Sequence, residues 1–221
     1  MRRFLIQVNV MATREEAKQV RRVKILAATR VLIRDTSVTI FSMRVLAKRA
    51  GVSLVTLYNL FGSKQAIMYA LLDEDIQQYG GQLSRSRLDP LAILFRAVTL
   101  GKTHFEREPD YYKAILFAVY SNGGTEFRTM FRGPRRELWR RLVAEAVEAQ
   151  CLEEWVDCEA FSVHLATIYF ANILEWVAGE ISLKDVETRT HYGFALALLG
   201  VATQTHTDVL LERITKAQKK L

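Results

Sequence analysis

The sequence is poor in the residues that cross-link or interrupt a chain. Among 221 residues there are two cysteines, Cys151 and Cys158, and three prolines, the first of them Pro90. Two cysteines cannot build a disulfide framework, which excludes a small disulfide-stapled domain and suits a reducing cytosol. Half of the residues are hydrophobic and a quarter are charged. The chain can therefore bury a substantial core, and a disordered chain is excluded.

Long apolar runs are also lacking. No uninterrupted run approaches the roughly 18 residues that a membrane-spanning helix needs. The basic start Met1–Arg3, followed by Phe4–Ile6, faintly resembles a secretory signal, but Gln7 and Asn9 interrupt it. We therefore expect a cytoplasmic protein that has a loose N-terminal arm and no membrane partner.

Acidic residues are scarce in the first part of the chain. Residues 1–64 contain 13 Lys and Arg but only Glu15, Glu16 and Asp35 as acids, whereas residues 65–221 contain 18 basic and 21 acidic residues. A basic head on a mildly acidic body favours a polyanionic partner, with nucleic acid ahead of an anionic membrane surface. An ordinary solvated helix face is the alternative explanation of the same charges.

Alternation of apolar and polar residues, the mark of strands, is nearly absent, while helical spacing recurs along the chain. Apolar residues repeat at helical intervals from Arg14 to Arg34, which predicts a first helix of about 20 residues. Asp89 and Pro90 form an N-cap and first helical position, and Pro109 with Asp110 opens the next helix.

The later turn signals complete an all-α prediction of about nine helices. Asn122–Gly124 is predicted to end the helix that begins at Pro109, and Gly133–Pro134 to break the following segment. The last two helices are expected at about 158–179 and 186–216. We expect two domains, residues 1–61 with the arm and three helices, and residues 62–221 with the rest.

Residues 42–61 predict two short helices joined by a tight turn. Ser42 and Ser53 are N-cap candidates, and Gly51 stands where the chain needs a left-handed conformation. The positions expected to face a shared core are Leu46, Ala47, Ala50, Leu57 and Leu60. This is the spacing of a helix-turn-helix, whose second helix fits the DNA major groove. A compact three-helix domain that never binds DNA is the alternative.

The stretch Ile25–Ile67 resembles the N-terminal domain of TetR-family transcriptional regulators. The resemblance rests on Ala50–Ser53 in the turn, on Tyr58 in the second helix, and on Phe61–Lys64 at the junction with a fourth helix. Two departures stand out. Ser37 replaces a usual glycine, and Leu54–Val55 replaces a usual small or polar pair.

The resemblance implies a dimeric repressor that a small hydrophobic ligand releases from its DNA operator. Thr56 and Asn59 would bond base edges, Leu54 and Val55 would pack on thymine methyl groups, and Tyr58 would bond a phosphate. The implied DNA-binding residues are Ser42, Arg44, Ser53, Leu54, Val55, Thr56, Tyr58, Asn59 and Lys64. At Lys64 the backbone N–H groups of a helix start capped by Ser63 are expected to matter more than the ammonium.

Residues 62–221 are expected to bind the ligand and to form the dimer. Dimerisation would use the last two helices, which are rich in small residues, although such residues also occur in monomer cores. The aromatic-rich middle of the chain supplies the ligand-pocket candidates Phe117, Tyr120, Trp139 and Tyr169. The four histidines show no metal-ligand spacing, so neither a metal nor a cofactor is expected.

Two other functions stay open at this point. A helical adaptor could bring its basic head to acidic proteins or anionic lipid. An enzyme could use the aromatic region, but the sequence contains no nucleophile–base set, no phosphate-binding glycine loop and no metal cluster, so we expect no enzymatic activity.

Overall fold

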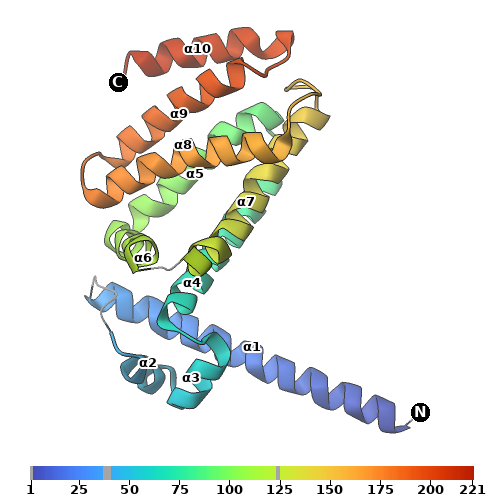
Figure 1. The fold of residues 1–221 in the computed structure, drawn as a ribbon, viewed down its shortest axis with the longest axis vertical. Coiled ribbons are helices and arrows are strands. Elements are labelled where there is room, and N and C mark those ends of the chain that lie inside the picture. Colours follow the sequence, from blue (N-terminus) through green and yellow to red (C-terminus); the bar gives the residue numbers. More distant parts are fainter. Residues whose placement is uncertain (1, 37–40, 123–124) are drawn as a thin grey trace. The chain divides into compact units, whose positions relative to one another are not determined.

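The computed structural model describes residues 2–36, 41–122 and 125–221 (Figure 1), and of the side chains within these ranges it does not describe those of 2–13, 121, 122, 125–132 and 134. This part of the chain is helical and contains no strand; an isolated bridge pairs Leu152 with Ala202. The all-α prediction is confirmed. The α-helices are α1 (Arg2–Thr36), α2 (Met43–Ala50), α3 (Leu54–Phe61), α4 (Lys64–Ser84), α5 (Pro90–Arg107), α6 (Pro109–Asn122), α7 (Thr125–Glu148), α8 (Cys158–Ala178), α9 (Leu183–Leu199) and α10 (Thr207–Gln218). A short 3-10 helix, η1 (Gln204–His206), precedes α10.

The chain divides into two compact units. Unit 1 comprises residues 1–72 and 113–128, and unit 2 comprises residues 73–112 and 129–221. Helices α4, α6 and α7 therefore each contribute residues to both units. These units are defined by how the chain packs, whereas the division predicted at residue 61 separates DNA binding from ligand binding and dimerisation. That division therefore stays a prediction.

In unit 1 the helices α1, α2 and α3 pack on one another. Ile25 and Ile33 of α1 are completely buried, as are Leu46 of α2 and Leu57 of α3. These apolar side chains recur at helical spacing, so each helix presents one stripe to the shared core. Ile67 at the start of α4 is also completely buried.

Unit 2 has a larger core built from α5, α7, α8, α9 and α10. Trp139 and Phe194 are its largest fully buried side chains, with ring centroids 5.4 Å apart in an edge-to-face arrangement. Helix α7 buries a stripe of side chains in this core, at Leu138, Trp139, Leu142, Val143 and Ala146. Asp89 caps α5 and Pro90 is its first residue, as predicted.

Three predicted helix boundaries are wrong. Helix α1 begins at Arg2 instead of near Arg14, so the expected loose arm is helical. Helix α7 continues through Gly133 and Pro134, although a proline inside a helix removes one backbone hydrogen bond and often kinks or breaks the helix. The segment 186–216 is not one helix: α9 ends at Leu199, and the chain then bonds through the Thr203 N–H to the Cys151 carbonyl at 3.1 Å.

Helix α8 bears on the expectation that the chain has no membrane partner. Of the helices in the described ranges, α8 is long and apolar enough to cross a membrane by length and composition, and little of its apolar window is buried within the chain. A core or interface helix passes the same test. Here α8 packs against α9 and starts at a capped N-terminus, with Asp157 accepting from the Glu159 N–H at 2.9 Å.

Candidate nucleic-acid interface

The turn between α2 and α3 has the geometry that the sequence predicted. Ser42 caps α2 by accepting from the Val45 N–H, and Ser53 caps α3 by accepting from the Thr56 N–H at 3.0 Å. Gly51 has φ 64° and ψ 36°, the left-handed conformation that glycine adopts without a steric penalty. The Val52 N–H then bonds the Ala47 carbonyl at 3.0 Å. Local sequence therefore fixes how α3 leaves the turn.

Buried apolar residues hold the second helix in place. Leu46, Ala47 and Leu57 are buried as predicted, with Leu46 and Leu57 at 0% exposure. Ala50 and Leu60, which were expected to face the same core, are only half-buried. The helices α2 and α3 are each eight residues long. Isolated helices of that length are unstable, so their order depends on this packing.

Arg22 of α1 supports the far end of α3, a role that the sequence analysis missed. Its guanidinium donates to the Leu60 carbonyl at 2.8 Å and lies 4.4 Å from the centre of the Phe61 ring. A basic residue at the C-terminal end of a helix is favourable because unpaired carbonyls gather there. The basic periodicity of α1 was visible in the sequence, but the partner of a single arginine was not.

The outer surface of α3 carries the predicted DNA-contacting side chains. Val55 is 68% exposed and Tyr58 is 48% exposed, and Asn59 is exposed beside them. Leu54 and Thr56 are half-buried, and the Thr56 hydroxyl lies 2.8 Å from that of Ser53. Exposed apolar and amide groups at the start of a capped helix are suited to base edges in a groove. Thr56 would have to share its hydroxyl between the cap and a base.

Lys64 has a structural partner that the sequence did not reveal. Its ammonium donates to the Phe41 carbonyl at 3.0 Å and lies 4.4 Å from the centre of the Phe41 ring. Partial burial lowers the pKa of this ammonium. Ser63 accepts from the Ala66 N–H at 3.1 Å, which confirms that Ser63 caps the start of α4. The ammonium thus ties Phe41, which precedes the Ser42 cap of α2, to the start of α4. The backbone N–H groups at that helix start stay the predicted contact for a phosphate.

Exposed basic side chains of α2 add positive charge to this surface. Arg44, Lys48 and Arg49 are exposed, and Ser42 is exposed at the capped end of the helix. Arg49 pairs with Asp35 at 2.6 Å, an exposed contact that contributes little stability but orients the side chain. The surface of α2 and α3 is therefore cationic, with apolar and amide groups on α3.

Residues 25–71 match the sequence pattern of the bacterial regulatory proteins of the tetR family. The match contains all of α2 and α3, the turn with Gly51, and the capped start of α4. By this match, residues 25–71 are similar to the DNA-binding domain of TetR-family transcription regulators, as the resemblance implied.

Solved structures share the TetR-family fold over most of the chain. A TetR transcriptional regulator from Rhodococcus sp. RHA1 is 22% identical with a TM-score of 0.69, and the match covers 83% of this chain and 98% of that one. The TetR-family repressor FadR from Thermus thermophilus, solved with lauroyl-CoA, is 20% identical with a TM-score of 0.72, covering 83% and 96%. RolR, solved with resorcinol, is 15% identical with a TM-score of 0.64, covering 90% and 95%. No curated protein sequence is significantly similar to the chain.

The four ligand-pocket candidates fall into different surroundings. Trp139 and Tyr169 lie together in unit 2, with ring centroids 5.9 Å apart in an edge-to-face arrangement. Phe117 and Tyr120 belong to unit 1, where Phe117 is 59% exposed and Tyr120 is half-buried. The structure therefore brings two of the four together within one unit.

Tyr169 has a feature that a ligand could use. Its hydroxyl oxygen is buried and has no hydrogen-bond partner among the described residues. Burial raises the pKa of this hydroxyl, which keeps it neutral. A Cβ at Gly101 would collide with the hydroxyl, so the missing side chain at Gly101 makes room for it. Buried hydroxyls without a partner are costly and rare.

Proposed function

We propose that the chain is a dimeric DNA-binding repressor that a small hydrophobic ligand releases from its operator. Residues 1–61 would bind DNA, and residues 62–221 would bind the ligand and form the dimer. The observation that carries the proposal is α3, an eight-residue helix held by Leu57 and capped by Ser53, with Val55, Tyr58 and Asn59 exposed on its outer surface. Such a helix can enter the major groove by its N-terminal residues.

Dimerisation is supported by apolar side chains that the chain itself leaves exposed. Val163 and Leu174 of α8 are 43% and 38% exposed, and Leu196 of α9 is 46% exposed. Little of the apolar window of α8 is buried within the chain, and large exposed apolar areas mark interfaces. By contrast Gly193 approaches Ile168 within one chain, so that small residue serves the α8–α9 packing. One base-reading helix supplies too little discrimination for a genomic site, and two copies supply enough.

The ligand part of the proposal rests on the buried Tyr169 hydroxyl beside Trp139. Lauroyl-CoA, found with FadR, has a long apolar acyl chain on a charged carrier, and resorcinol, found with RolR, is an aromatic ring with two hydroxyl groups, so each ligand combines an apolar part with polar groups. A ligand of that chemistry would pack on the Trp139 ring and offer a partner to the Tyr169 hydroxyl. Apolar pockets with a few placed polar groups are typical of small-molecule sites.

Selection of DNA fragments tests the DNA-binding function directly. The purified chain is mixed with fragments of its source genome, bound fragments are recovered, and affinity for the enriched sequence is measured by fluorescence anisotropy. We expect enrichment of a palindromic sequence whose half-sites lie about one helical turn, 34–36 Å, or a multiple of it apart. Failure to enrich any sequence, or a solution mass of one chain, would contradict the proposal.

Asn59→Ala is expected to weaken binding to the enriched sequence by about 5- to 150-fold per half-site, because a good base contact contributes about 1–3 kcal/mol. When the base pair that Asn59 contacts is substituted in each half-site, Asn59→Ala should cause a smaller loss of affinity than it does on the enriched sequence. Substituting the base pairs one at a time therefore identifies the base that Asn59 contacts. Gln78→Ala is the matched control, since it removes an exposed amide from α4. An equal loss in both variants would show that Asn59 contacts no base.

Tyr169→Phe is expected to stabilise the free protein by about 1–3 kcal/mol, because it removes a buried hydroxyl that lacks a partner. Urea unfolding measures the gain, and thermal shift with lauroyl-CoA and with resorcinol as probes measures ligand binding. The variant should respond less than the wild type to whichever probe binds. Tyr192→Phe is the control, since that hydroxyl accepts from Gln218 at 3.3 Å. A destabilised Tyr169→Phe would show that the hydroxyl has a partner.

A further inference from the structure

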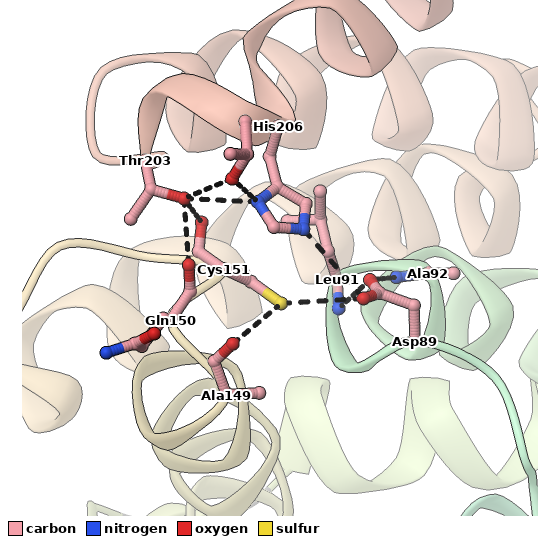
Figure 2. Close-up of polar contacts among 9 residues, drawn as sticks. Asp89, Leu91, Ala92, Ala149, Gln150, Cys151, Thr203 and His206 are labelled. Atoms are coloured by element: carbon pink, nitrogen blue, oxygen red, sulfur yellow. Dashed lines mark hydrogen bonds and ion pairs between the residues drawn. The ribbon is translucent and has the colours of Figure 1, made fainter.

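Three side chains from distant parts of the sequence meet in unit 2. Asp89 caps α5, Cys151 lies in the turn after α7, and His206 ends η1. One ligand atom of each, a carboxylate oxygen, the thiol sulfur and an imidazole nitrogen, lies within 4.8 Å of the other two (Figure 2). Sequence spacing could not reveal the cluster, because each residue belongs to a different connection between helices.

The measured separations are close to those of ligands around one small cation. The Cys151 Sγ is 3.6 Å from the Asp89 Oδ2, and the His206 Nε2 is 3.8 Å from the same oxygen. A tetrahedral Zn²⁺ with ordinary bond lengths places sulfur and oxygen about 3.6 Å apart, and nitrogen and oxygen about 3.4 Å apart. The third separation, between the Cys151 sulfur and the imidazole nitrogen, lies within 4.8 Å, so modest side-chain rotations would bring the three atoms to one ion.

Hydrogen bonds already orient the carboxylate. The Asp89 Oδ1 accepts from the Leu91 N–H at 2.9 Å and from the Ala92 N–H at 3.4 Å. These bonds fix Oδ1 at the start of α5, and Oδ2 is the oxygen that faces Cys151 and His206 (Figure 2). Metal-ligating carboxylates are held in this way by a second set of bonds.

The imidazole is held in the same manner. The His206 Nδ1 lies 3.1 Å from the Thr203 hydroxyl and 3.0 Å from the Thr205 hydroxyl, while Nε2 faces Asp89. The other ring nitrogen of a metal-bound histidine almost always bonds an acceptor, which sets the tautomer and the ring orientation. Thr203 also donates to the Gln150 carbonyl at 2.8 Å, next to Cys151.

The backbone around the cluster is fixed independently of these side chains. Leu152 and Ala202 form the isolated bridge, and the Glu153 N–H bonds the Val201 carbonyl at 2.9 Å. The Thr203 N–H bonds the Cys151 carbonyl at 3.1 Å. The segments that carry Cys151 and His206 are thus joined before any ion binds, so binding an ion would require little ordering of the backbone.

We propose that Asp89, Cys151 and His206 bind one Zn²⁺ ion. A thiolate, an imidazole and a carboxylate together suit zinc better than the oxygen-preferring Mg²⁺ or Ca²⁺. On binding, the Cys151 thiol loses its proton to solvent and the sulfur bonds the metal. Three protein ligands leave one position of the tetrahedron for water or another small donor. The inference does not depend on DNA binding.

Cobalt titration of the metal-free full chain tests the site. Co²⁺ takes zinc positions and gives a thiolate-to-metal charge-transfer absorption only when sulfur is bound. We expect one Co²⁺ per chain with that absorption, displaced by one equivalent of Zn²⁺. Absence of the absorption would overturn the proposal, and so would displacement by Mg²⁺ but not by Zn²⁺.

Single substitutions identify the ligands. Cys151→Ala should abolish the charge-transfer absorption, and His206→Gln and Asp89→Asn should each weaken cobalt binding by more than about 10-fold. Asparagine still caps a helix, so Asp89→Asn should fold. Cys158→Ala is the matched control and should leave the titration unchanged. If Cys151→Ala lost its helical circular dichroism, His206→Gln, whose side chain is partly exposed, would decide instead. Loss of the absorption in Cys158→Ala alone would overturn the assignment.

Discussion

Raising the salt concentration from 50 to 200 mM should weaken binding to the selected DNA by about 10³- to 10⁵-fold. Each phosphate that a lysine or arginine neutralises releases condensed counterions from DNA, and added salt opposes that release. The magnitude corresponds to about 6–10 phosphate contacts per dimer, or about three to five per protomer. The exposed cations of α2, Arg44, Lys48 and Arg49, would supply three such contacts per protomer. Anisotropy titrations at four or five salt concentrations measure the slope.

Substitution of one basic residue distinguishes a direct contact with a phosphate from the effect of the protein's overall positive charge. Arg44→Ala should reduce the slope of log affinity against log salt by about one per protomer, with a similar loss on every DNA sequence. Lys184→Ala, an exposed lysine at the start of α9, is the matched control and should leave the slope unchanged. Equal changes in the two variants, or a wild-type affinity that is insensitive to salt, would exclude a phosphate-binding surface on α2.

The features that local sequence dictates could be predicted. The caps at Ser42, Ser53 and Asp89 and the left-handed turn at Gly51 each depend on one residue and its nearest neighbours, and all four are confirmed. The core positions Leu46 and Leu57 followed from helical spacing for the same reason. Such features need no knowledge of the rest of the chain.

The features that depend on distant partners could not be predicted. Pro134 reads as a break, yet α7 continues through it. Lys64 reads as a free cation, whereas it bonds the Phe41 carbonyl. The break between α9 and α10 depends on a backbone bond from Thr203 to Cys151, and no local signal announces that pairing. The Asp89, Cys151 and His206 cluster exists for the same reason, since it forms where these connections meet.

Leu57→Ala should destabilise the packing of α3 by about 2–5 kcal/mol, because the side chain is completely buried and its removal leaves a cavity. The effect should be local, since α3 is held by few other contacts. Hydrogen exchange measures it: the amides of α3, including the Leu57 N–H that bonds the Ser53 carbonyl at 3.1 Å, should exchange about 30- to 5,000-fold faster. Amides of α9 in unit 2 should keep their protection.

Val55→Ala is the control that separates folding from recognition. It lies two residues from Leu57 on the same helix and is 68% exposed, so its truncation leaves no cavity and should leave the exchange of α3 unchanged. Both variants should weaken DNA binding, Leu57→Ala by loosening the helix and Val55→Ala by removing an apolar contact from a correctly held one. Rapid α3 exchange in Val55→Ala would mean that the outer surface of α3 contributes to its stability. Full DNA affinity in Leu57→Ala, with rapid exchange confirmed, would mean that DNA does not bind through α3.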